Sequence, residues 1–216
     1  RAARMSAQYG ARVATAEDKY MGGTCVNVGC VPKKLFVYAS HYSEDYHQAQ
    51  GFGWDQVAPG FNWSTLLENK NTEIARLNGI YKGLLDNAGV SHFDGRARIV
   101  DQHHVAIGDT VVSTEKILIA TGSWPVVPEV PGSEHAVTSN EAFFLEELPQ
   151  HCLVVGGGYI AVEFAGIFHG LGVGTTLSYR GPLFLRNFDI DIRKTVRKEL
   201  EKKNIGLQFE SNATSI

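Results

Sequence analysis

The sequence is poor in cysteine, has no long apolar run and shows no strong excess of either charge. Only three cysteines occur in 216 residues and no secretory signal segment is recognisable, which indicates a reducing compartment. No apolar run approaches membrane-spanning length. The net charge is −3 and the basic residues are scattered, which argues against nucleic acid and anionic membranes as partners. These absences predict a soluble, cytoplasmic protein of one to two domains.

Two of the three cysteines are separated by only four residues, at a predicted helix start. Cys25 and Cys30 lie in the segment Gly-Gly-Thr-Cys-Val-Asn-Val-Gly-Cys-Val-Pro-Lys-Lys, residues 22–34. The intervening glycine lets the chain turn back, which favours a disulfide-range separation, and Pro32 favours a first helical turn. At a helix N-terminus the backbone N–H groups favour a thiolate, and Lys33 adds to that field. The spacing therefore indicates reversible disulfide chemistry.

Two other interpretations of the cysteine pair are a metal site and a structural disulfide. Zinc needs further ligands, but Cys152 stands alone and His103-His104 falls in a distant hairpin pattern. We therefore expect no metal. A structural bridge stays open on spacing alone, although the low cysteine content favours a redox function.

The first residues have the pattern of a helix and strand from a nucleotide-binding unit. Residues 1–10 resemble the later part of a helix closed by Gly10, and residues 12–16 predict a buried strand ending at Glu17. In a βαβ unit such an acid binds a ribose hydroxyl, but a solvated acid at a strand end is the alternative. The chain has no initiator methionine, and the glycine loop that precedes such a helix is missing.

The middle of the chain predicts a long helix and a small meander. A stripe of apolar residues at near-helical spacing predicts a helix over residues 61–88 with most of the stripe in a core. The stripe consists of Leu66, Leu67, Ile74, Leu77, Ile80, Tyr81 and Leu84. Three short alternating runs between residues 96 and 112 predict an antiparallel meander. The apolar run 116–122 predicts a buried strand whose end approaches a cofactor.

A second nucleotide-binding signal follows the third cysteine. The predicted strand 152–155 leads through three glycines into a predicted helix over 159–171. Gly156, Gly158 and Ala161 meet the pattern G-x-G-x-x-A in this strand-turn-helix context. Glycines there let the backbone approach a pyrophosphate, which the helix N-terminus stabilises.

Arginines follow the next predicted strand, residues 174–178, where an NAD-specific site places an acid. Arg180 comes two residues after this strand and Arg186 six residues later. Guanidinium groups in place of a carboxylate suit the 2′-phosphate of NADP. The alternative is an ordinary pair of surface arginines.

The sequence resembles the flavoprotein disulfide reductases over essentially its whole length, and most closely the bacterial glutathione reductases among the class I pyridine nucleotide-disulfide oxidoreductases. The motifs that carry the resemblance are residues 22–34, 120–122 and 156–163, together with Arg180 and Arg186. The resemblance implies an α/β fold of two Rossmann-like FAD/NAD(P)-binding domains, both incomplete, with a small antiparallel meander.

The resemblance also implies domain limits and missing parts. It implies an FAD-binding domain in residues 1–122 and an NADP-binding domain in residues 123–216, with the proline-rich stretch 124–131 at the boundary. The first strand and glycine loop, the rest of the NADP domain and the dimer interface domain are then absent. That interface domain would supply a His-Glu acid–base pair from the partner in a homodimer. We expect the chain alone to be inactive, and a non-catalytic nucleotide-binding fragment is the alternative.

By resemblance, NADPH reduces FAD, which reduces a Cys25–Cys30 disulfide, which in turn reduces glutathione disulfide to glutathione. Cys30 then faces the flavin and Cys25 attacks the substrate. The resemblance implies a Lys33 and Glu163 pair beside the flavin. The cofactor-binding residues implied are Glu17, Gly23, Thr24, Lys33, Ala120, Thr121, Gly122, Gly156, Gly158, Tyr159, Ile160, Ala161, Glu163, Arg180 and Arg186. Tyr159 is the residue that would cover the nicotinamide pocket.

Glutathione is the substrate that the resemblance favours. Arg4 matches a position where glutathione reductases carry an arginine for a peptide carboxylate, and Ile80 and Tyr81 match their substrate helix. Residues 51–54 and 123–125 also resemble trypanothione reductases, whose substrate is cationic. Dihydrolipoamide dehydrogenase is a further alternative, but it usually prefers NAD. Mercuric reductase needs cysteines that this chain lacks.

Overall fold

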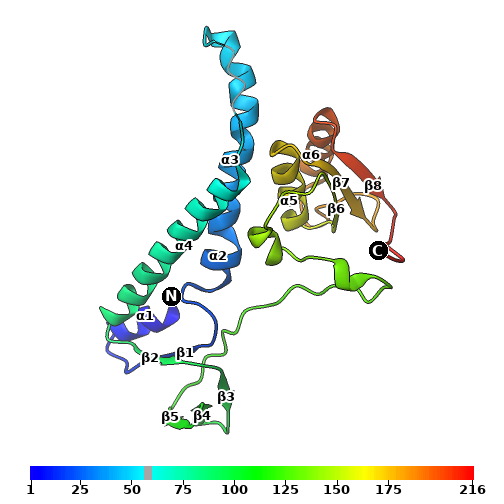
Figure 1. Cartoon of the computed structure of the whole chain (residues 1–216). Coiled ribbons are helices and arrows are strands. Elements are labelled where there is room, and N and C mark those ends of the chain that lie inside the picture. Colours follow the sequence, from blue (N-terminus) through cyan, green and yellow to red (C-terminus); the bar gives the residue numbers. More distant parts are fainter. Residues whose placement is uncertain (56–59) are drawn as a thin grey trace. The chain divides into compact units, whose positions relative to one another are not determined.

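The computed structural model describes residues 1–55 and 60–216, which form two compact units (Figure 1). Unit 1 comprises residues 1–31 and 71–124, and unit 2 comprises residues 32–70 and 125–216. The division falls inside two long helices, α3 (Cys30–Ala49) and α4 (Trp63–Asp86).

Unit 1 contains a two-stranded parallel sheet and two short helices. Its elements up to the meander are α1 (Ala2–Gln8), β1 (Ala14–Glu17), α2 (Gly23–Val28), the later part of α4, and β2 (Ser91–Asp94). The strands pair in register from Ala14 opposite Ser91 to Glu17 opposite Asp94. Gly10, at φ 92°, follows α1 in the left-handed conformation that glycine adopts at helix ends. The predicted first helix and strand are therefore confirmed.

The predicted antiparallel meander is also confirmed in unit 1. It consists of β3 (Ala97–Ile99), β4 (His104–Ile107) and β5 (Thr110–Ser113), in the order β3-β4-β5. Ile107 pairs with Thr110 across the tight turn. Gly108 takes φ 55° in this turn, a conformation that costs glycine less than other residues.

The prediction of a buried strand over residues 116–122 is wrong. This segment is not part of any sheet in the structure, and the side chains of Leu118 and Ile119 are 71% and 68% exposed. A strand forms only where a neighbouring strand accepts and donates its backbone hydrogen bonds, and the sheet of unit 1 ends at β1 and β2. For the same reason β1, predicted to be buried, alternates between exposed and half-buried residues.

Unit 2 is built on a three-stranded parallel sheet. Its elements after α3 are η1 (Gln50–Phe52), the start of α4, η2 (Ser133–His135), η3 (Glu141–Phe144), β6 (His151–Val155), α5 (Tyr159–Gly170), β7 (Gly174–Tyr179), α6 (Ile190–Lys202) and β8 (Gly206–Phe209). The strand order is β6-β7-β8. Asp189 caps α6 by accepting a hydrogen bond from the Asp191 N–H at 2.9 Å. The predicted strand, glycine turn and helix are thus confirmed, and with them the α/β fold class.

The core of unit 2 lies between its sheet and the helices α5 and α6. One buried cluster joins all three elements and consists of Ala165, Leu177, Phe184, Leu185, Leu200 and Ile205. A second cluster is aromatic: the ring centroids of Phe36 and Trp63 lie 5.0 Å apart, and those of Phe143 and Phe164 lie 5.2 Å apart. Burial of such rings is a large stabilising contribution, which anchors α3 and the start of α4 in this unit.

Helix α3 packs closely against α5 within unit 2. A Cβ atom added to Gly170 would lie 2.7 Å from the Ser40 carbonyl oxygen, so no larger residue fits between the helices without movement. The Ser43 hydroxyl donates to the Gly170 carbonyl at 2.9 Å. Glu44 forms an ion pair with Lys203 at the end of α6. A glycine thus sets the distance between α3 and α5.

Helix α4 confirms the predicted element but only part of the predicted core stripe. Ile74 is 9% exposed, whereas Ile80, Tyr81 and Leu84 are 44%, 41% and 37% exposed. Helical spacing shows which residues share a face, but burial needs a neighbouring element to cover that face.

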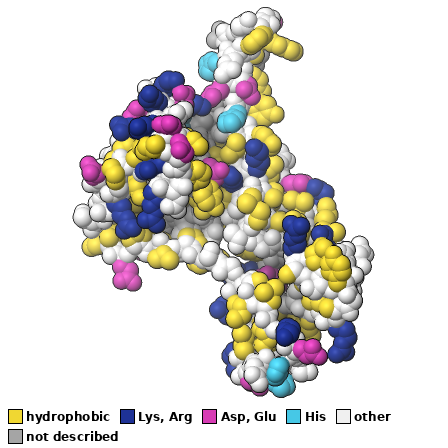
Figure 2. All heavy atoms as spheres, turned by 180° about the vertical axis from the view of Figure 1, so that it is seen from behind, with side chains coloured by type: hydrophobic (Ala, Val, Ile, Leu, Met, Phe, Trp, Pro, Cys, Tyr) yellow, Lys and Arg dark blue, Asp and Glu magenta, His cyan; other side chains and the backbone are white. Residues whose placement is uncertain are grey.

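The outer surface carries mixed charge. On the face drawn in Figure 2, basic and acidic side chains lie interspersed with exposed apolar ones. Among the residues that the structure describes, no helix combines the length and the apolarity needed to cross a membrane.

Candidate functional site

The cysteine segment forms a short helix that turns directly into a long one. Cys25 lies in α2, and α3 begins at Cys30, which confirms the predicted helix start at that residue. Both cysteines are exposed. A Cβ atom added to Gly29 would lie 2.8 Å from the Thr24 carbonyl oxygen and 3.1 Å from the Cys25 Cα. The glycine therefore lets the chain fold back against the turn that carries Cys25, although the disulfide itself stays a prediction.

A buried asparagine, Asn27, and a half-buried one, Asn78, hold the cysteine helix, and neither belongs to the predicted site residues. The Asn27 amide, 6% exposed, donates to the carbonyls of Met21 and Gly23 at 2.9 Å each. The Asn78 amide on α4 donates to the Asn27 Oδ1 at 2.9 Å and to the Met21 carbonyl at 2.7 Å. Buried amides whose groups are bonded fix local geometry, because each lost partner costs free energy. A polar residue midway between the two cysteines was the available signal.

Three separate stretches of unit 1 approach one another near the end of β1. The Glu17 carboxylate accepts a hydrogen bond from the Lys19 N–H at 2.9 Å. The Lys19 ammonium lies 3.4 Å from the centroid of the Trp124 ring, a favourable cation–π contact. Gly122, at φ 73°, lies beside Thr24, since an added Cβ would be 3.8 Å from the Thr24 Oγ1. These contacts connect the segments that carry Glu17, Thr24 and Gly122, which are predicted to bind FAD; Gly23, Ala120 and Thr121, also predicted to bind FAD, are their neighbours in sequence.

This part of unit 1 is open enough to receive a ligand. Thr24, Ala120, Thr121 and Gly122 are exposed, and nothing lies within 4 Å of a Cβ added to Gly23. Burial raises the pKa of the nearby Tyr20 phenol, and the negative charge of Glu17 raises it further. The residues present therefore fit a group that needs a carboxylate for ribose and an open backbone for phosphate.

Lys33 and Glu163 form an ion pair, as the family resemblance implied. The Lys33 Nζ lies 2.6 Å from the Glu163 Oε1, and the two side chains are 24% and 34% exposed. Lys33 belongs to α3 and Glu163 to α5, both within unit 2. The residues stand 130 positions apart, so only the packing of α3 on α5 brings them together.

The glycine turn after β6 has the features of a pyrophosphate-binding loop. A Cβ added to Gly156 would lie 3.1 Å from the Ala161 Cβ, so small residues are needed at both positions. Helix α5 starts after Gly158 with no side chain capping its first N–H groups, and Tyr159 and Ile160 there are 59% and 46% exposed. Uncapped N–H groups at the start of a 12-residue helix favour an anionic ligand.

The arginines predicted to select NADP lie on the surface beyond β7. The strand ends at Tyr179, and the exposed Arg180 follows it directly at the carboxyl end of the sheet. Arg186 is also exposed. Parallel α/β sheets bind nucleotides at this end, so Arg180 occupies the position that the prediction requires.

The three predicted substrate residues all belong to unit 1. Arg4 on α1 is half-buried, and its Nε is buried without a hydrogen-bond partner among the described residues. A buried guanidinium donor without an acceptor is costly, which favours a ligand oxygen there. Ile80 and Tyr81 on α4 are exposed.

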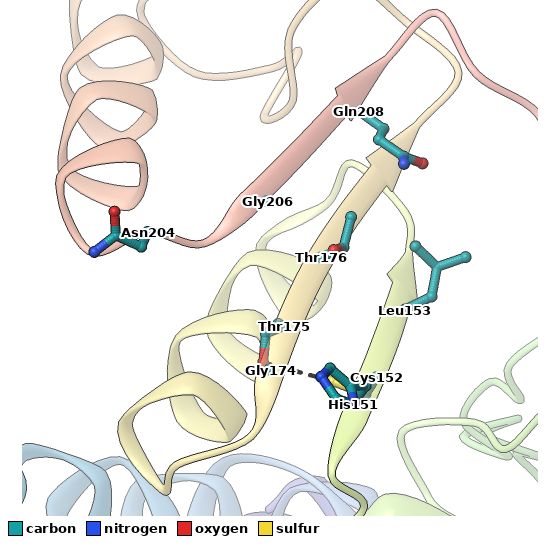
Figure 3. Close-up of a pocket in the computed structure, with 9 residues that line it drawn as sticks. All are labelled: His151, Cys152, Leu153, Gly174, Thr175, Thr176, Asn204, Gly206 and Gln208. Carbon is teal, nitrogen blue, oxygen red and sulfur yellow. Dashed lines mark hydrogen bonds between the residues drawn. The ribbon is translucent and has the colours of Figure 1, made fainter.

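A shallow hollow of about 550 Å³ lies elsewhere on unit 2 (Figure 3). It is lined by the first residues of the strands, including His151, Gly174 and Gly206, and by Leu153 on the uncovered face of the sheet. This is the amino end of the sheet, opposite to the glycine turn and Arg180. The hollow therefore lies away from the predicted pyrophosphate-binding turn.

Cys152 lies at this hollow, in unit 2. Burial raises the pKa of its thiol, and its Sγ lies 3.6 Å from the Thr175 Oγ1. Within residues 1–55 and 60–216, no group of three or more His, Cys, Asp or Glu side chains is arranged to hold a metal ion.

Comparison with known proteins identifies the family. All 216 residues match the family described as "Pyridine nucleotide-disulphide oxidoreductase". The chain belongs to this family of oxidoreductases. It is 45% identical over 216 residues to a glutathione reductase of Burkholderia cepacia, covering 100% of this chain and 48% of that protein. It is 42% identical over 215 residues to a glutathione reductase of Nostoc, covering 100% of this chain and 47% of that protein.

Other members of the family are also similar. A trypanothione reductase of Leishmania donovani is 44% identical over 211 residues, which cover 91% of this chain and 43% of that protein. The structure resembles that of the HOCl-induced flavoprotein disulfide reductase RclA from Escherichia coli, with a TM-score of 0.83, 28% identity and coverage of 99% of this chain and 47% of that one. The chain thus spans about half the length of the relatives that it matches. The family resemblance and the fold class are confirmed, while the assigned site residues and the domain limits at 122 and 123 stay predictions.

Proposed function

We propose that the protein containing this chain reduces glutathione disulfide with electrons from NADPH, through FAD and a Cys25–Cys30 disulfide. The observation that carries the NADPH assignment is Arg180 at the carboxyl end of β7, in the same unit as the uncapped glycine turn at α5. A guanidinium there suits a 2′-phosphate, whereas NAD-specific sites need a carboxylate. The relatives named glutathione reductase support the disulfide substrate.

The residues that would hold FAD are the cluster at the end of β1. Glu17 would accept a hydrogen bond from a ribose hydroxyl, and the exposed backbone at Thr24 and Gly122 would leave room for the phosphates and the flavin ring. When bound, FAD supplies a carrier that accepts a hydride from a nicotinamide and returns two electrons to a disulfide. We assign FAD binding to residues 1–122 and NADPH binding to residues 123–216.

The two cysteines would divide the disulfide exchange between them. The N-terminal dipole of α3 stabilises a thiolate at Cys30, and Cys25 is exposed for attack on a substrate disulfide. Glu163 holds the Lys33 ammonium at 2.6 Å, which fixes a positive charge three residues after Cys30 in the same helix. We propose that this charge stabilises the reduced, negatively charged form of the redox centre.

Glutathione disulfide is preferred over a cationic disulfide because of Arg4. Its buried, unpartnered Nε needs an acceptor, and the carboxylate of glutathione supplies one. Trypanothione disulfide is the second candidate, since a trypanothione reductase is 44% identical. Ile80 and Tyr81 would form the neighbouring wall of the site.

The deciding experiment is a steady-state assay of the full-length, FAD-loaded protein with either nucleotide and either disulfide. We expect NADPH and glutathione disulfide to be preferred, and Cys25→Ser to abolish turnover. The double variant Arg180→Ala and Arg186→Ala should raise the KM for NADPH about tenfold while leaving the KM for NADH unchanged. A wild-type preference for NADH, or for trypanothione disulfide, would refute the corresponding assignment.

The Arg4 assignment has its own test in the same assay. Arg4→Glu should raise the KM for glutathione disulfide, because the new carboxylate repels the substrate. An unchanged KM would remove Arg4 from the substrate site.

For the full-length protein we also propose a cytoplasmic homodimer without metal. Gel filtration of the full-length protein tests for the mass of a dimer. The purified 216-residue chain should be inactive in the same assay. A yellow colour of that chain would report bound flavin.

A further inference from the structure

The ring of Tyr179 occupies a slot between two glycines of unit 2. A Cβ atom added to Gly157 would lie 2.3 Å from the ring Cε2 and 2.4 Å from Cδ2. A Cβ added to Gly181 would lie 2.7 Å from Cε1, on the opposite edge of the same ring. The ring also packs against the buried cluster around Leu177. Tyr179 is thus held on both edges and cannot swing aside cheaply.

This slot explains why residue 157 is a glycine, although the nucleotide-binding pattern does not require glycine at this position. In G-x-G-x-x-A, Gly157 stands at the variable x between Gly156 and Gly158, so the pattern allows a side chain there. The backbone allows one as well, since Gly157 is not among the residues with positive φ. The Tyr179 ring excludes it, because real Cβ contacts do not approach 2.3 Å.

The same loop residue is held through its carbonyl group. The Leu185 N–H donates to the Gly157 carbonyl at 2.6 Å, and Leu185 takes the uncommon φ of 57° to do so. The Gly156 N–H donates to the Ser178 carbonyl at 2.9 Å, next to Tyr179 in β7. The centre of the turn is therefore clamped between β7 and the segment that follows it.

We propose that Tyr179 is a positioning residue for the pyridine nucleotide, because its ring holds the Gly156–Gly158 turn where the pyrophosphate binds. This inference rests on the proposed binding of NADPH to unit 2. The ring edges perform the role, since the closest approaches are to ring carbons and the phenolic oxygen lies farther away, at 3.2 Å from a Cβ added to Gly181. The phenolic hydroxyl is not required. Tyr179 directly precedes Arg180, so the segment proposed to select NADP also sets the shape of the phosphate-binding turn.

The test measures the Kd for NADP⁺ by calorimetry on the full-length, FAD-loaded protein, which requires no turnover. Gly157→Ala should weaken binding about tenfold, because the new methyl group displaces either the ring or the turn. Tyr179→Ile should weaken binding a few-fold, since the turn loses its support on one side. The double variant should bind within about threefold of wild type, because the methyl group then fills part of the vacated slot.

Three further variants separate positioning from general folding. Tyr179→Phe keeps the ring and should bind like wild type. Gly181→Ala presses on the opposite ring edge and should weaken binding in the same direction as Gly157→Ala. Gly166→Ala, on α5 with nothing within 4 Å of its added Cβ, should leave the Kd unchanged. The KM for glutathione disulfide and the flavin content should stay constant throughout.

The outcomes distinguish this inference from the proposed function. A wild-type protein that does not bind NADP⁺ refutes the proposed function and the positioning role with it. A wild-type protein that binds NADP⁺, with Gly157→Ala equally tight or the double variant no better than Gly157→Ala, refutes the positioning role alone. If Gly157→Ala does not fold, Gly181→Ala and Tyr179→Ile carry the test, and normal binding by both would overturn the proposal.

Discussion

The two parallel sheets of this protein have similar sequence signals and different outcomes. In unit 2, β6, β7 and β8 pair in sequence and bury Leu177 completely beneath α5 and α6. In unit 1, the sheet stops at β1 and β2, and the apolar run 116–122 stays outside it with Leu118 71% exposed. An apolar run therefore specifies a buried strand only where the fold supplies both a neighbouring strand and a covering helix.

The same difference separates the two regions that we propose to bind nucleotides. The glycine turn of unit 2 is clamped by hydrogen bonds from Gly156 and to Gly157, with a ring packed against it. In the region around Glu17 in unit 1, the side-chain contacts include the hydrogen bond from the Lys19 N–H to Glu17 and the cation–π contact between the exposed side chains of Lys19 and Trp124. We expect unit 2 to resist unfolding more strongly than unit 1.

The largest effect should come from truncating matched leucines in the two regions. Leu177→Ala should lower the free energy of unfolding by about 3–5 kcal/mol, because it leaves a cavity at a position with 0% exposure. Leu118→Ala should change it by less than about 0.5 kcal/mol, since the side chain is already in water. Urea unfolding of both variants measures the difference, and equal costs would show that residue 118 is buried after all.

The second effect concerns a buried cation in unit 2. The Lys70 side chain is 1% exposed, and its Nζ donates to the Phe143 carbonyl at 2.8 Å and lies 4.0 Å from the Phe144 ring centroid. Burial lowers the pKa of Lys70 to about 8. Between pH 8 and the ordinary lysine value, near 10.5, the unfolded chain binds more protons than the folded one. The contribution of Lys70 to the free energy of unfolding should therefore increase with pH across that window, by on the order of 3 kcal/mol.

Lys70→Met provides the control for this pH dependence. The wild type should gain stability relative to the variant as pH rises from 8 to 10.5, while their difference stays constant below pH 8. The buried Trp63, which contacts Phe36, reports unit 2 by fluorescence once the exposed Trp54 and Trp124 are changed to Phe. A parallel pH response of both proteins would contradict the assignment to Lys70.

A third comparison uses two glycines of the same helix. Gly170→Ala should cost about 1–3 kcal/mol, because the added methyl group meets Ser40 on α3. Gly166→Ala, with open space around it, should be neutral or stabilising by up to about 1 kcal/mol through helix propensity. Thermal unfolding compares them, and similar values would show that the α3–α5 contact is not tight.

The smallest effect on stability should come from the ion pair between Lys33 and Glu163. Both side chains are partly exposed, so Glu163→Gln should lower the free energy of unfolding by at most about 1 kcal/mol. If the proposed function holds, the same variant should change the flavin absorption spectrum of the reduced protein far more than its stability. A loss of several kcal/mol would indicate a structural role instead.

Local patterns predicted those elements whose partners are near in sequence. The meander at residues 97–113 needs only hairpin turns, and Gly108 supplies one; the start of α3 at Cys30 needs only Pro32 and the preceding turn. The burial of the α4 stripe was predicted less well, because Tyr81 shares a face with Ile74 and is nevertheless 41% exposed, against 9% for Ile74. The spacing of apolar residues shows which of them share a face of the helix, whereas the elements packed against that face determine whether it is buried.

The sequence by itself determined the family, the cysteine segment, the fingerprint at Gly156 and the arginines after β7, since each is a local pattern with a local physical cause. Only the tertiary structure joined Lys33 to Glu163, Asn27 to Asn78 and Gly157 to Tyr179. These contacts connect residues between 22 and 130 positions apart, so they depend on how helices and strands pack rather than on spacing. The same packing left residues 116–122 without a neighbouring strand, which no reading of their apolar side chains reveals.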